Sequence, residues 1–310
     1  MKQKVIAIVG PTAVGKTNLS IEVAKKFNGE IISGDSMQVY RGMDIGTAKI
    51  KKEEMQGIPH HMINIKDPHE SFSVADFQYY VQKYIKEISE RNHIPIIVGG
   101  SGLYIQSVLY DYHFSKEKRD DALTKSLEAE MNKYGIEPLY DRLKQIDPTQ
   151  AEKIHPNNYR RVIRALEVYE KTGLTMTAYQ SQQQEEMPYD SMLIGLEMER
   201  SLLYERINLR IDEMIRAGLL EEVRQLINCG YENASSMKAI GYKELIPYIK
   251  GEASLETSVE LLKRNSRRYA KRQYTWFKNK MDVHWYHVTP LTVSEKVNEI
   301  LHDLAGFLKS

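Results

Sequence analysis

The clearest chemical signal in the sequence is a glycine-rich octapeptide near the N-terminus. Residues 10–17 read GPTAVGKT and match the pattern G-x-x-x-x-G-K-[ST], after an apolar run and before a helical pattern. Backbone N–H groups of such a loop form a hollow for phosphate, Lys16 adds a positive charge, and the hydroxyl of Thr17 can ligate Mg²⁺. We therefore expect this segment, the phosphate loop, to bind a diphosphate or triphosphate, with Thr17 as the metal ligand. The expected diphosphate-binding residues are Gly10, Pro11, Thr12, Ala13, Val14, Gly15, Lys16 and Thr17.

A second signal is an aspartate, Asp35, one strand further along the chain. Enzymes that hydrolyse nucleoside triphosphates on such a loop usually hold Mg²⁺ with an acid at the end of a neighbouring apolar strand. The best candidate strand, IPIIV, ends instead in Gly99 and Gly100. Asp35 follows the short strand EIIS, at the sheet edge where substrates of open α/β folds bind. We expect it to accept a proton from a nucleophile that attacks the compound on the loop; a turn or helix cap in SGDS is the alternative.

A basic segment near the C-terminus indicates a polyanionic partner. The net charge of the chain is only +1, yet residues 263–280 contain eight Lys or Arg and no Asp or Glu. On a helix, apolar side chains such as Leu262, Tyr269 and Phe277 share one side, and the cations share the other. Such a row suits a phosphodiester backbone, and a merely solvated face is the alternative. The cations are Arg264, Arg267, Arg268, Lys271, Arg272 and Lys278.

Two smaller arginine groups stand elsewhere in the chain. Arg160, Arg161 and Arg164 fall opposite the apolar side of the helical pattern NYRRVIRALEVYEKTG, so two basic helices could contact one folded RNA. Arg206 and Arg210 lie one helical turn apart in ERINLR. They either join the active site or pair with neighbouring acids, and the helical pattern does not decide between these roles.

Composition excludes several classes of protein. The 310 residues are 42% hydrophobic and 27% charged, which is typical of a globular protein and not of a disordered one. No apolar run approaches the roughly 20 residues that span a bilayer. The single cysteine, Cys229, cannot form an internal disulfide. We expect a cytoplasmic protein with no export signal and no membrane partner.

The elements that must position these residues alternate between strands and helices. Short apolar runs predict buried strands at residues 4–9, 30–33 and 94–98, and a capped amphipathic pattern predicts a helix over 73–91. This order predicts an α/β fold, a P-loop NTPase-like parallel sheet flanked by helices. Helical patterns without a buried strand interrupt it. We expect a core of residues 1–114 and 192–310, including the C-terminal basic helices, and an inserted, mostly helical RNA-binding domain at 115–191.

Taken together, the motifs are similar to those of a known family. GPTAVGKT, SGDSMQVYRGMDIGTAKI, PHHMINI, VGGSGLY, IHPNNYRRVIRALEVY, KAIGYKEL and RRYAKRQYTWF follow in the order seen in bacterial tRNA dimethylallyltransferases, also called isopentenyl-tRNA transferases. The resemblance spans nearly the whole chain. It implies transfer of a dimethylallyl group from its diphosphate to N6 of adenosine 37 of tRNA, next to the anticodon, with Mg²⁺ as cofactor. The implied partners are dimethylallyl diphosphate and the anticodon stem-loop, and the chain is expected to act as a monomer.

The resemblance also implies roles for individual residues. Asp35 is the implied general base toward the adenine amine, Thr12 lies within reach of the substrates, and Arg210 steadies the leaving diphosphate. Residues 36–38 hold the flipped base, and Ser101 stands where relatives often carry threonine. The implied tRNA-binding residues are Asp35, Ser36, Met37, Gln38, Ser101, Arg160, Arg161, Arg164, Lys238, Gly241, Tyr242, Lys243, Arg264, Arg268, Lys271 and Arg272.

Three other functions compete with this interpretation. A prenyltransferase acting on a free adenine nucleotide would need neither the helical insertion nor the basic helix. A small-molecule or nucleoside kinase would bind ATP at the phosphate loop, and the acid missing after IPIIV counts only modestly against it. A non-enzymatic RNA-binding module would leave the phosphate loop without a purpose.

Overall fold

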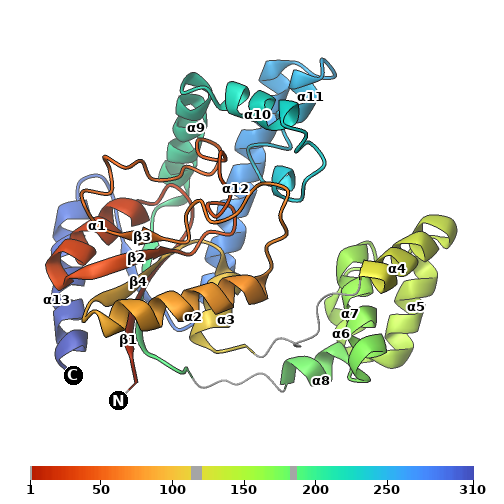
Figure 1. The fold of residues 1–310 in the computed structure, drawn as a ribbon, viewed down its shortest axis with the longest axis horizontal. Coiled ribbons are helices and arrows are strands. Elements are labelled where there is room, and N and C mark those ends of the chain that lie inside the picture. The colour runs from red at the N-terminus through yellow and green to blue at the C-terminus, as the bar shows by residue number, and fades with distance from the viewer. Residues whose placement is uncertain (1, 113–120, 182–186) are drawn as a thin grey trace. The chain divides into compact units, whose positions relative to one another are not determined.

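A parallel sheet forms the centre of the computed structural model, which describes residues 2–112, 121–181 and 187–310 (Figure 1). Within these residues six strands pair in the order β3-β2-β4-β1-β5-β6, and every neighbouring pair is parallel. The predicted α/β class is therefore confirmed. The strands are β1 (Lys4–Val9), β2 (Gly29–Ser33), β3 (His60–His61), β4 (Ile94–Gly99), β5 (Asp190–Glu197) and β6 (His284–His287).

Register places the carboxyl ends of the central strands side by side. Val9 at the end of β1 lies opposite Gly99 of β4 and Gly195 of β5, and Ser33 of β2 lies opposite Val98. The segments that follow these strands therefore meet at one edge of the sheet. They are the phosphate loop, the Asp35 turn and the Gly100–Ser101 turn.

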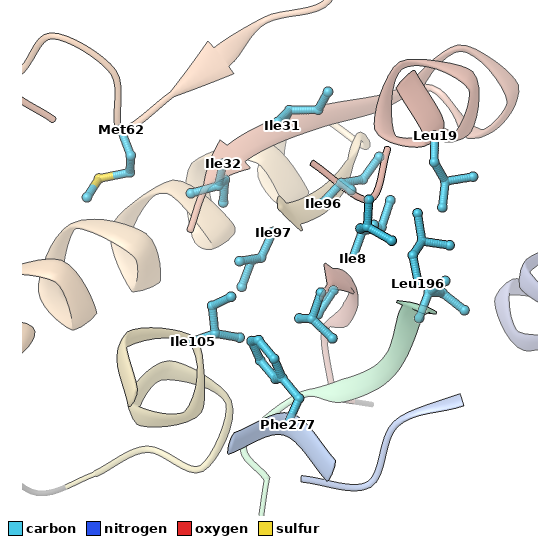
Figure 2. Packing of buried hydrophobic residues seen from close by; sticks show 14 of the residues in the cluster. Ile8, Leu19, Ile31, Ile32, Met62, Ile96, Ile97, Ile105, Leu196 and Phe277 are labelled. Carbon is cyan, nitrogen blue, oxygen red and sulfur yellow. The ribbon is translucent and has the colours of Figure 1, made fainter. Parts of the chain in front are cut away.

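Helices cover both faces of the sheet. Ile8, Ile96 and Leu196 point toward Leu19 of α1, whereas Ile97 points toward Ile105 of α3 and Phe277 of α12 (Figure 2). The strands are apolar on both sides because each side faces a helical layer. The helices of this unit are α1 (Lys16–Phe27), α2 (Val74–Glu90), α3 (Gly102–Leu109), α9 (Arg200–Arg216), α10 (Leu219–Asn228), the 3₁₀ helix η1 (Ser236–Lys238), α11 (Ile246–Ile249), α12 (Leu255–Lys280) and α13 (Val293–Lys309).

Helix α2 begins where the sequence predicts. Ser73 accepts a hydrogen bond from the Asp76 backbone N–H, and the Asp76 carboxylate accepts one from the Ser73 backbone N–H, so the capping box is present. Phe77, Val81 and Ile85 are fully buried on its inner face. Among the described residues, no helix has the length and apolar character needed to cross a membrane.

The chain divides into two units. One comprises residues 1–110 and 187–310, and the other comprises residues 111–186. The second unit has a separate small core that includes Leu139, Leu143, Val162 and Leu166. The expected boundary at 115 lies within residues 113–120, which are outside the described ranges, and the expected boundary at 191 lies within β5. Its helices are α4 (Asp121–Tyr134), α5 (Glu137–Ile146), α6 (Pro148–Lys153), α7 (Tyr159–Thr172) and α8 (Met176–Ser181).

Candidate active site

The phosphate loop joins β1 to α1 in a conformation that depends on its glycines. Gly10 and Gly15 have φ angles of 139° and 111°, which side chains rarely allow. A Cβ atom at Gly10 would lie 2.7 Å from the carbonyl oxygen of Leu196, so a larger residue does not fit. Helix α1 begins at Lys16, and the positive end of its dipole therefore adjoins the loop N–H groups.

Lys16 folds back over the loop. Its Nζ donates hydrogen bonds to the carbonyl oxygens of Gly10 at 2.9 Å and Pro11 at 2.6 Å. Burial and, to a smaller extent, the positive charge of Arg210 lower the pKa of Lys16 to about 7, although the negative charge of Asp35 opposes them. Lys16 is thus a cation without a strong anionic partner inside the site. A bound diphosphate would supply one.

Asp35 lies directly after β2, as expected. Its Oδ1 accepts a hydrogen bond from the Met37 backbone N–H at 2.7 Å. Burial raises the pKa of Asp35, while the backbone N–H groups of Met37 and Gln38 and the charges of Lys16 and Arg210 oppose that rise. The Asp35 turn approaches the end of β4 closely, since a Cβ at Gly99 would lie 2.3 Å from the Gly34 carbonyl oxygen. That contact leaves no room for an acidic side chain at Gly99.

Arg210 is the arginine of α9 that lines both cavities of the site together with Asp35. It is half-buried, and it interacts electrostatically with both Lys16 and Asp35. Arg206, one turn earlier, is exposed and lines only the larger of the two cavities described next. Between the two roles that the sequence left open for this pair, the geometry favours an active-site role for Arg210.

Two cavities meet at these residues. The larger, of about 960 Å³, is lined by residues 12–17 of the phosphate loop. The smaller, of about 290 Å³, has a mainly apolar wall with side chains such as Ile207 and Met214. Seven residues line both cavities: two alanines, Thr47, whose hydroxyl donates to the Met43 carbonyl oxygen, and four others with polar side chains. Those four mark the place where two substrates could meet. They are Thr12, Asp35, Arg210 and Tyr269.

Sequence reasoning missed two residues of α12 at this junction. Gln273 accepts a hydrogen bond from the Thr12 backbone N–H at 2.9 Å and donates one to the Gly100 carbonyl oxygen at 3.1 Å. Tyr269 was expected in the core, but it lines both cavities, and burial raises the pKa of its hydroxyl to about 12. Gln273 could have been noticed in the sequence, because it is a polar residue on the apolar side of the helix, one turn after Tyr269.

The turn after Asp35 lies between the two cavities. The Ser36 backbone N–H donates to the Ser101 hydroxyl at 3.2 Å, which joins the β2 and β4 turns. Ser36 and Met37 line the smaller cavity, and Gln38 lines the larger one. The Gln38 side chain accepts a hydrogen bond from the Ser33 hydroxyl at 2.8 Å and donates one to the Thr47 carbonyl oxygen at 3.2 Å.

The segment after η1 forms another part of the wall. Lys238 and Gly241 line the smaller cavity, and the side chain of Lys243 is exposed beside Glu244. Tyr242 differs from the expectation, because its side chain is 0% exposed and its hydroxyl donates to Glu222. In this structure the burial of the side chain leaves it no surface for tRNA, so Tyr242 stays a predicted tRNA-binding residue only through the segment that carries it. The ring of Tyr242 packs against Gly46, which lines the smaller cavity.

The cations of α12 differ in their surroundings. Arg264, Arg268 and Lys271 are exposed, and Arg272 lines the smaller cavity. Arg267 donates to the side chain of Asn208 at 2.7 Å. Lys278 pairs with Glu197 at 3.1 Å, an acid that lies outside the basic segment. The acid comes from β5, far from Lys278 in sequence, where a helical wheel cannot find it.

The second unit carries its own basic face on α7. Arg160 and Arg161 are exposed, and the guanidinium of Arg160 lies over the ring of Tyr159. Arg164 pairs with the buried carboxylate of Glu167 at 3.3 Å. The expected basic surface of this helix is therefore formed mainly by Arg160 and Arg161.

The donor set at the loop fits a magnesium ion held largely by a phosphate substrate. Thr17 is exposed, lines the larger cavity and stands at the start of α1. Within the described parts of the chain, no group of three or more His, Cys, Asp or Glu residues could hold a metal on its own. Mg²⁺ often takes only one or two protein ligands, the rest being water and substrate phosphate. Thr17 would be one of those ligands.

Comparisons with known proteins agree with this geometry. The sequence model described as IPP transferase matches residues 38–280. A tRNA dimethylallyltransferase of Oceanobacillus iheyensis is 62% identical over 100% of this chain and 99% of its own length. The chain belongs to the IPP transferase family.

Solved structures of family members have the same fold. The full-length tRNA isopentenylpyrophosphate transferase from Bacillus halodurans is 52% identical, with a TM-score of 0.76 over 99% of this chain and 97% of its own. A eukaryotic dimethylallyltransferase, described as acting on tRNA, is 33% identical, with a TM-score of 0.84 over 98% of this chain and 80% of its own. The IPP transferase fold thus extends over both units.

Proposed function

We propose that this chain transfers a dimethylallyl group from dimethylallyl diphosphate to N6 of adenosine 37 of tRNA and releases diphosphate. One observation carries the proposal: Asp35 and Thr12 of the phosphate loop both line the two cavities, at the place where these cavities meet. Such a displacement needs a loop that binds the leaving group and a carboxylate that faces the attacking group. Family membership and the names of the relatives support the same reaction.

On the donor side, the protein neutralises the charge that develops on the leaving diphosphate. As the allylic C–O bond breaks, negative charge grows on the diphosphate oxygens. The phosphate loop, Lys16 and Arg210 line the larger cavity, and their N–H groups and positive charges would stabilise that negative charge. Bound Mg²⁺, with Thr17 as a ligand, would add positive charge to the same oxygens. Thr12 is proposed to contact the reacting groups because it lines both cavities.

On the acceptor side, Asp35 is proposed as the general base. The lone pair of the adenine amine is delocalised into the ring, so the amine is a poor nucleophile. As its nitrogen forms the bond to the allylic carbon, one N–H proton passes to the Asp35 carboxylate. The raised pKa of Asp35 makes the carboxylate a better proton acceptor than an ordinary surface aspartate.

The tRNA is proposed to bind along the basic surfaces and to insert one base. Base flipping costs a few kcal/mol, which backbone contacts can offset. Exposed Arg264, Arg268 and Lys271 are available on α12, and Arg160 and Arg161 on α7. Near the junction, the proposed contacts are with Ser36, Met37, Gln38, Ser101, Lys238, Gly241, Lys243 and Arg272.

We propose a monomer that acts in the cytoplasm. A single chain contributes the phosphate loop, Asp35, Arg210 and the basic surface of α12, so a partner chain is not required to complete the site. The cytoplasm is proposed because it contains the tRNA substrate.

A transfer assay tests the proposed function. The protein is incubated with Mg²⁺, radiolabelled dimethylallyl diphosphate and unmodified tRNA with adenosine at position 37, and in parallel with free AMP. A tRNA with guanosine at that position is the matched control. We expect label in the first tRNA only. Label in AMP alone, or transfer of phosphate from ATP in a parallel reaction, would contradict the proposal and favour the alternative acceptors or a kinase.

A further inference from the structure

The carboxylate of Glu222, on α10, receives four hydrogen bonds. Its Oε2 accepts from the backbone N–H groups of Asp44 at 3.0 Å and Ile45 at 2.7 Å. Its Oε1 accepts from the Gly46 backbone N–H at 3.0 Å and from the Tyr242 hydroxyl at 2.6 Å. Three consecutive backbone N–H groups converge on one anion, as in the backbone nests that bind external anions. Here the anion belongs to the protein.

The four donors belong to two walls of the smaller cavity. Residues 46–48 line it from one segment, and residues 238–241 line it from the other. The two walls touch, because a Cβ at Gly46 would lie 2.6 Å from the ring of Tyr242 and one at Gly241 would lie 3.4 Å from the Gly46 carbonyl oxygen. Glu222 itself lines neither cavity. Its carboxylate therefore acts only through the residues that it holds.

A short chain of contacts leads from Glu222 to the Asp35 turn. The carbonyl oxygen of Thr47, next to Gly46, accepts a hydrogen bond from the Gln38 side chain at 3.2 Å. Gln38 stands three residues after Asp35, and its backbone N–H interacts with the Asp35 carboxylate. A shift of residues 44–47 would thus reach the turn that carries the proposed base. Thr47 also lines the larger cavity, but its hydroxyl donates to the Met43 carbonyl oxygen, within its own segment, at 2.6 Å.

We propose that Glu222 is a positioning residue for the transfer reaction, holding residues 44–47 against residues 238–242 so that the acceptor cavity beside Asp35 keeps its shape. The proposal rests on the proposed function, since it assigns the smaller cavity to the acceptor side. A purely structural role would lower the stability of the whole unit. A positioning role predicts that loss of Glu222 lowers kcat and leaves the Kd of the donor, dimethylallyl diphosphate, nearly unchanged.

The decisive variant is Glu222→Gln, which keeps the size of the side chain. An amide nitrogen cannot accept hydrogen bonds and would confront backbone donors, so up to two of the four bonds are lost. We expect kcat with tRNA to fall by at least about 10-fold. The Kd of dimethylallyl diphosphate, measured by calorimetry, should stay within about 2-fold of wild type, because the four donors to Glu222 lie outside the phosphate loop.

Two further variants complete the test. Glu221→Gln changes the exposed neighbour, which pairs with Arg224 and does not contact residues 44–46, and it should behave as wild type. Tyr242→Phe removes one donor and leaves the ring in place. It should lower kcat by about 3-fold without changing donor affinity, and it tests the proposal even if Glu222→Gln fails to fold.

The results separate this proposal from the proposed function. If wild-type protein transfers no label to tRNA, the proposed function is wrong, and the role of Glu222 that rests on it is wrong as well. If wild type is active and Glu222→Gln keeps its kcat, the positioning role is wrong. It is also wrong if donor affinity falls as far as kcat, since that result indicates general loss of structure. Wild-type kcat in Tyr242→Phe would likewise overturn it.

Discussion

Gln273 accepts a hydrogen bond from the backbone N–H of Thr12, and the two residues are 261 positions apart in the sequence. The same side chain donates to the carbonyl oxygen of Gly100. One glutamine of α12 therefore connects the phosphate loop to the turn after β4. It fits because Gly100 has no side chain: a Cβ there would lie 2.0 Å from the Gln273 Nε2 atom.

Replacing Gln273 should disturb donor binding more than tRNA binding. In Gln273→Met the Thr12 N–H loses its acceptor in a largely buried place, and the loop would shift to find another. We expect the KM for dimethylallyl diphosphate to rise by about 10-fold, the equivalent of one lost buried hydrogen bond. Steady-state kinetics, with the concentration of each substrate varied in turn, measure the KM for dimethylallyl diphosphate and the KM for tRNA. Gln225→Met, at an exposed glutamine of α10, is the control, and an equal rise in both variants would contradict the assignment.

Asp35→Asn should remove the proton acceptor while keeping the shape of the side chain. We expect kcat to fall by about 10²–10⁴-fold, the usual contribution of a positioned general base. The Kd for tRNA, measured by filter binding, should change little, because the amide oxygen can still accept from the Met37 N–H. A variant that retains wild-type kcat would show that Asp35 is not the base. Loss of tRNA binding would make its role structural.

The affinity for the donor should depend on pH through Lys16. Its pKa is lowered to about 7 in the free protein, and a bound diphosphate raises that pKa because opposite charge favours the protonated amine. Binding at pH 8 should therefore take up a proton, and affinity should decrease as pH rises above 7. Calorimetry in buffers of different ionisation enthalpy measures the uptake. Lys16→Met should abolish it, and wild type without uptake would refute the prediction.

The exposed cations of α12 should contribute to tRNA affinity and to its salt dependence, whereas the paired one should not. Arg268→Ala is expected to weaken binding and to reduce the slope of log K against log salt by about 1. Lys278→Ala should leave that slope unchanged, since Lys278 is paired with Glu197. Titrations of tRNA at several salt concentrations compare the two. Equal slopes in both variants would contradict the division of these cations.

A buried carboxylate at the amino end of β2 should make the fold sensitive to acid. Burial alone would raise the pKa of Glu30, but hydrogen bonds from Arg91, His61 and His93 outweigh it and lower the pKa to about 2. Because this pKa is depressed below its ordinary value of 4.5, the stabilisation is complete above pH 4.5 and is lost as pH falls toward 2.

The variant Glu30→Gln tests whether the ionised Glu30 carboxylate makes the stability of the fold depend on pH. We expect it to lower the free energy of unfolding at pH 7 by about 1–3 kcal/mol and by less at pH 3. Urea denaturation at both values measures the difference. Glu90→Gln, on the exposed surface of α2, is the control. A destabilisation that is the same at both pH values would show that the ionised carboxylate is not responsible.

Much of the fold was predictable because its signals are local. The strands β1 and β4 are short apolar runs, and α2 starts at a capping box that depends on residues three positions apart. Asp35 was found in the same way, as an acid directly after a strand. In a parallel sheet, such positions meet at one edge whatever the rest of the chain does.

The contacts of a side chain were not predictable where its partners lie far away in the sequence. Tyr242 is adjacent to cavity-lining residues in sequence, yet its ring lies behind Gly46 and its hydroxyl reaches Glu222. Lys278 belongs to a basic helix, but β5 supplies an acid for it. Tyr269 was read as a core residue because apolar periodicity identifies the inner face of a helix without identifying what that face contacts.

The sequence by itself determined the parallel sheet, the phosphate loop, the position of Asp35 and the resemblance to a family, because these depend on residues close together along the chain. Only the tertiary structure decided that Arg210 rather than Arg206 lines both cavities together with Asp35 and that Gln273 and Glu222 hold the walls of the site. Hydrogen bonds and electrostatic contacts act over a few ångströms in space. Folding brings such partners together from distant positions, as it does for Thr12 and Gln273, 261 residues apart, and no local pattern records that proximity.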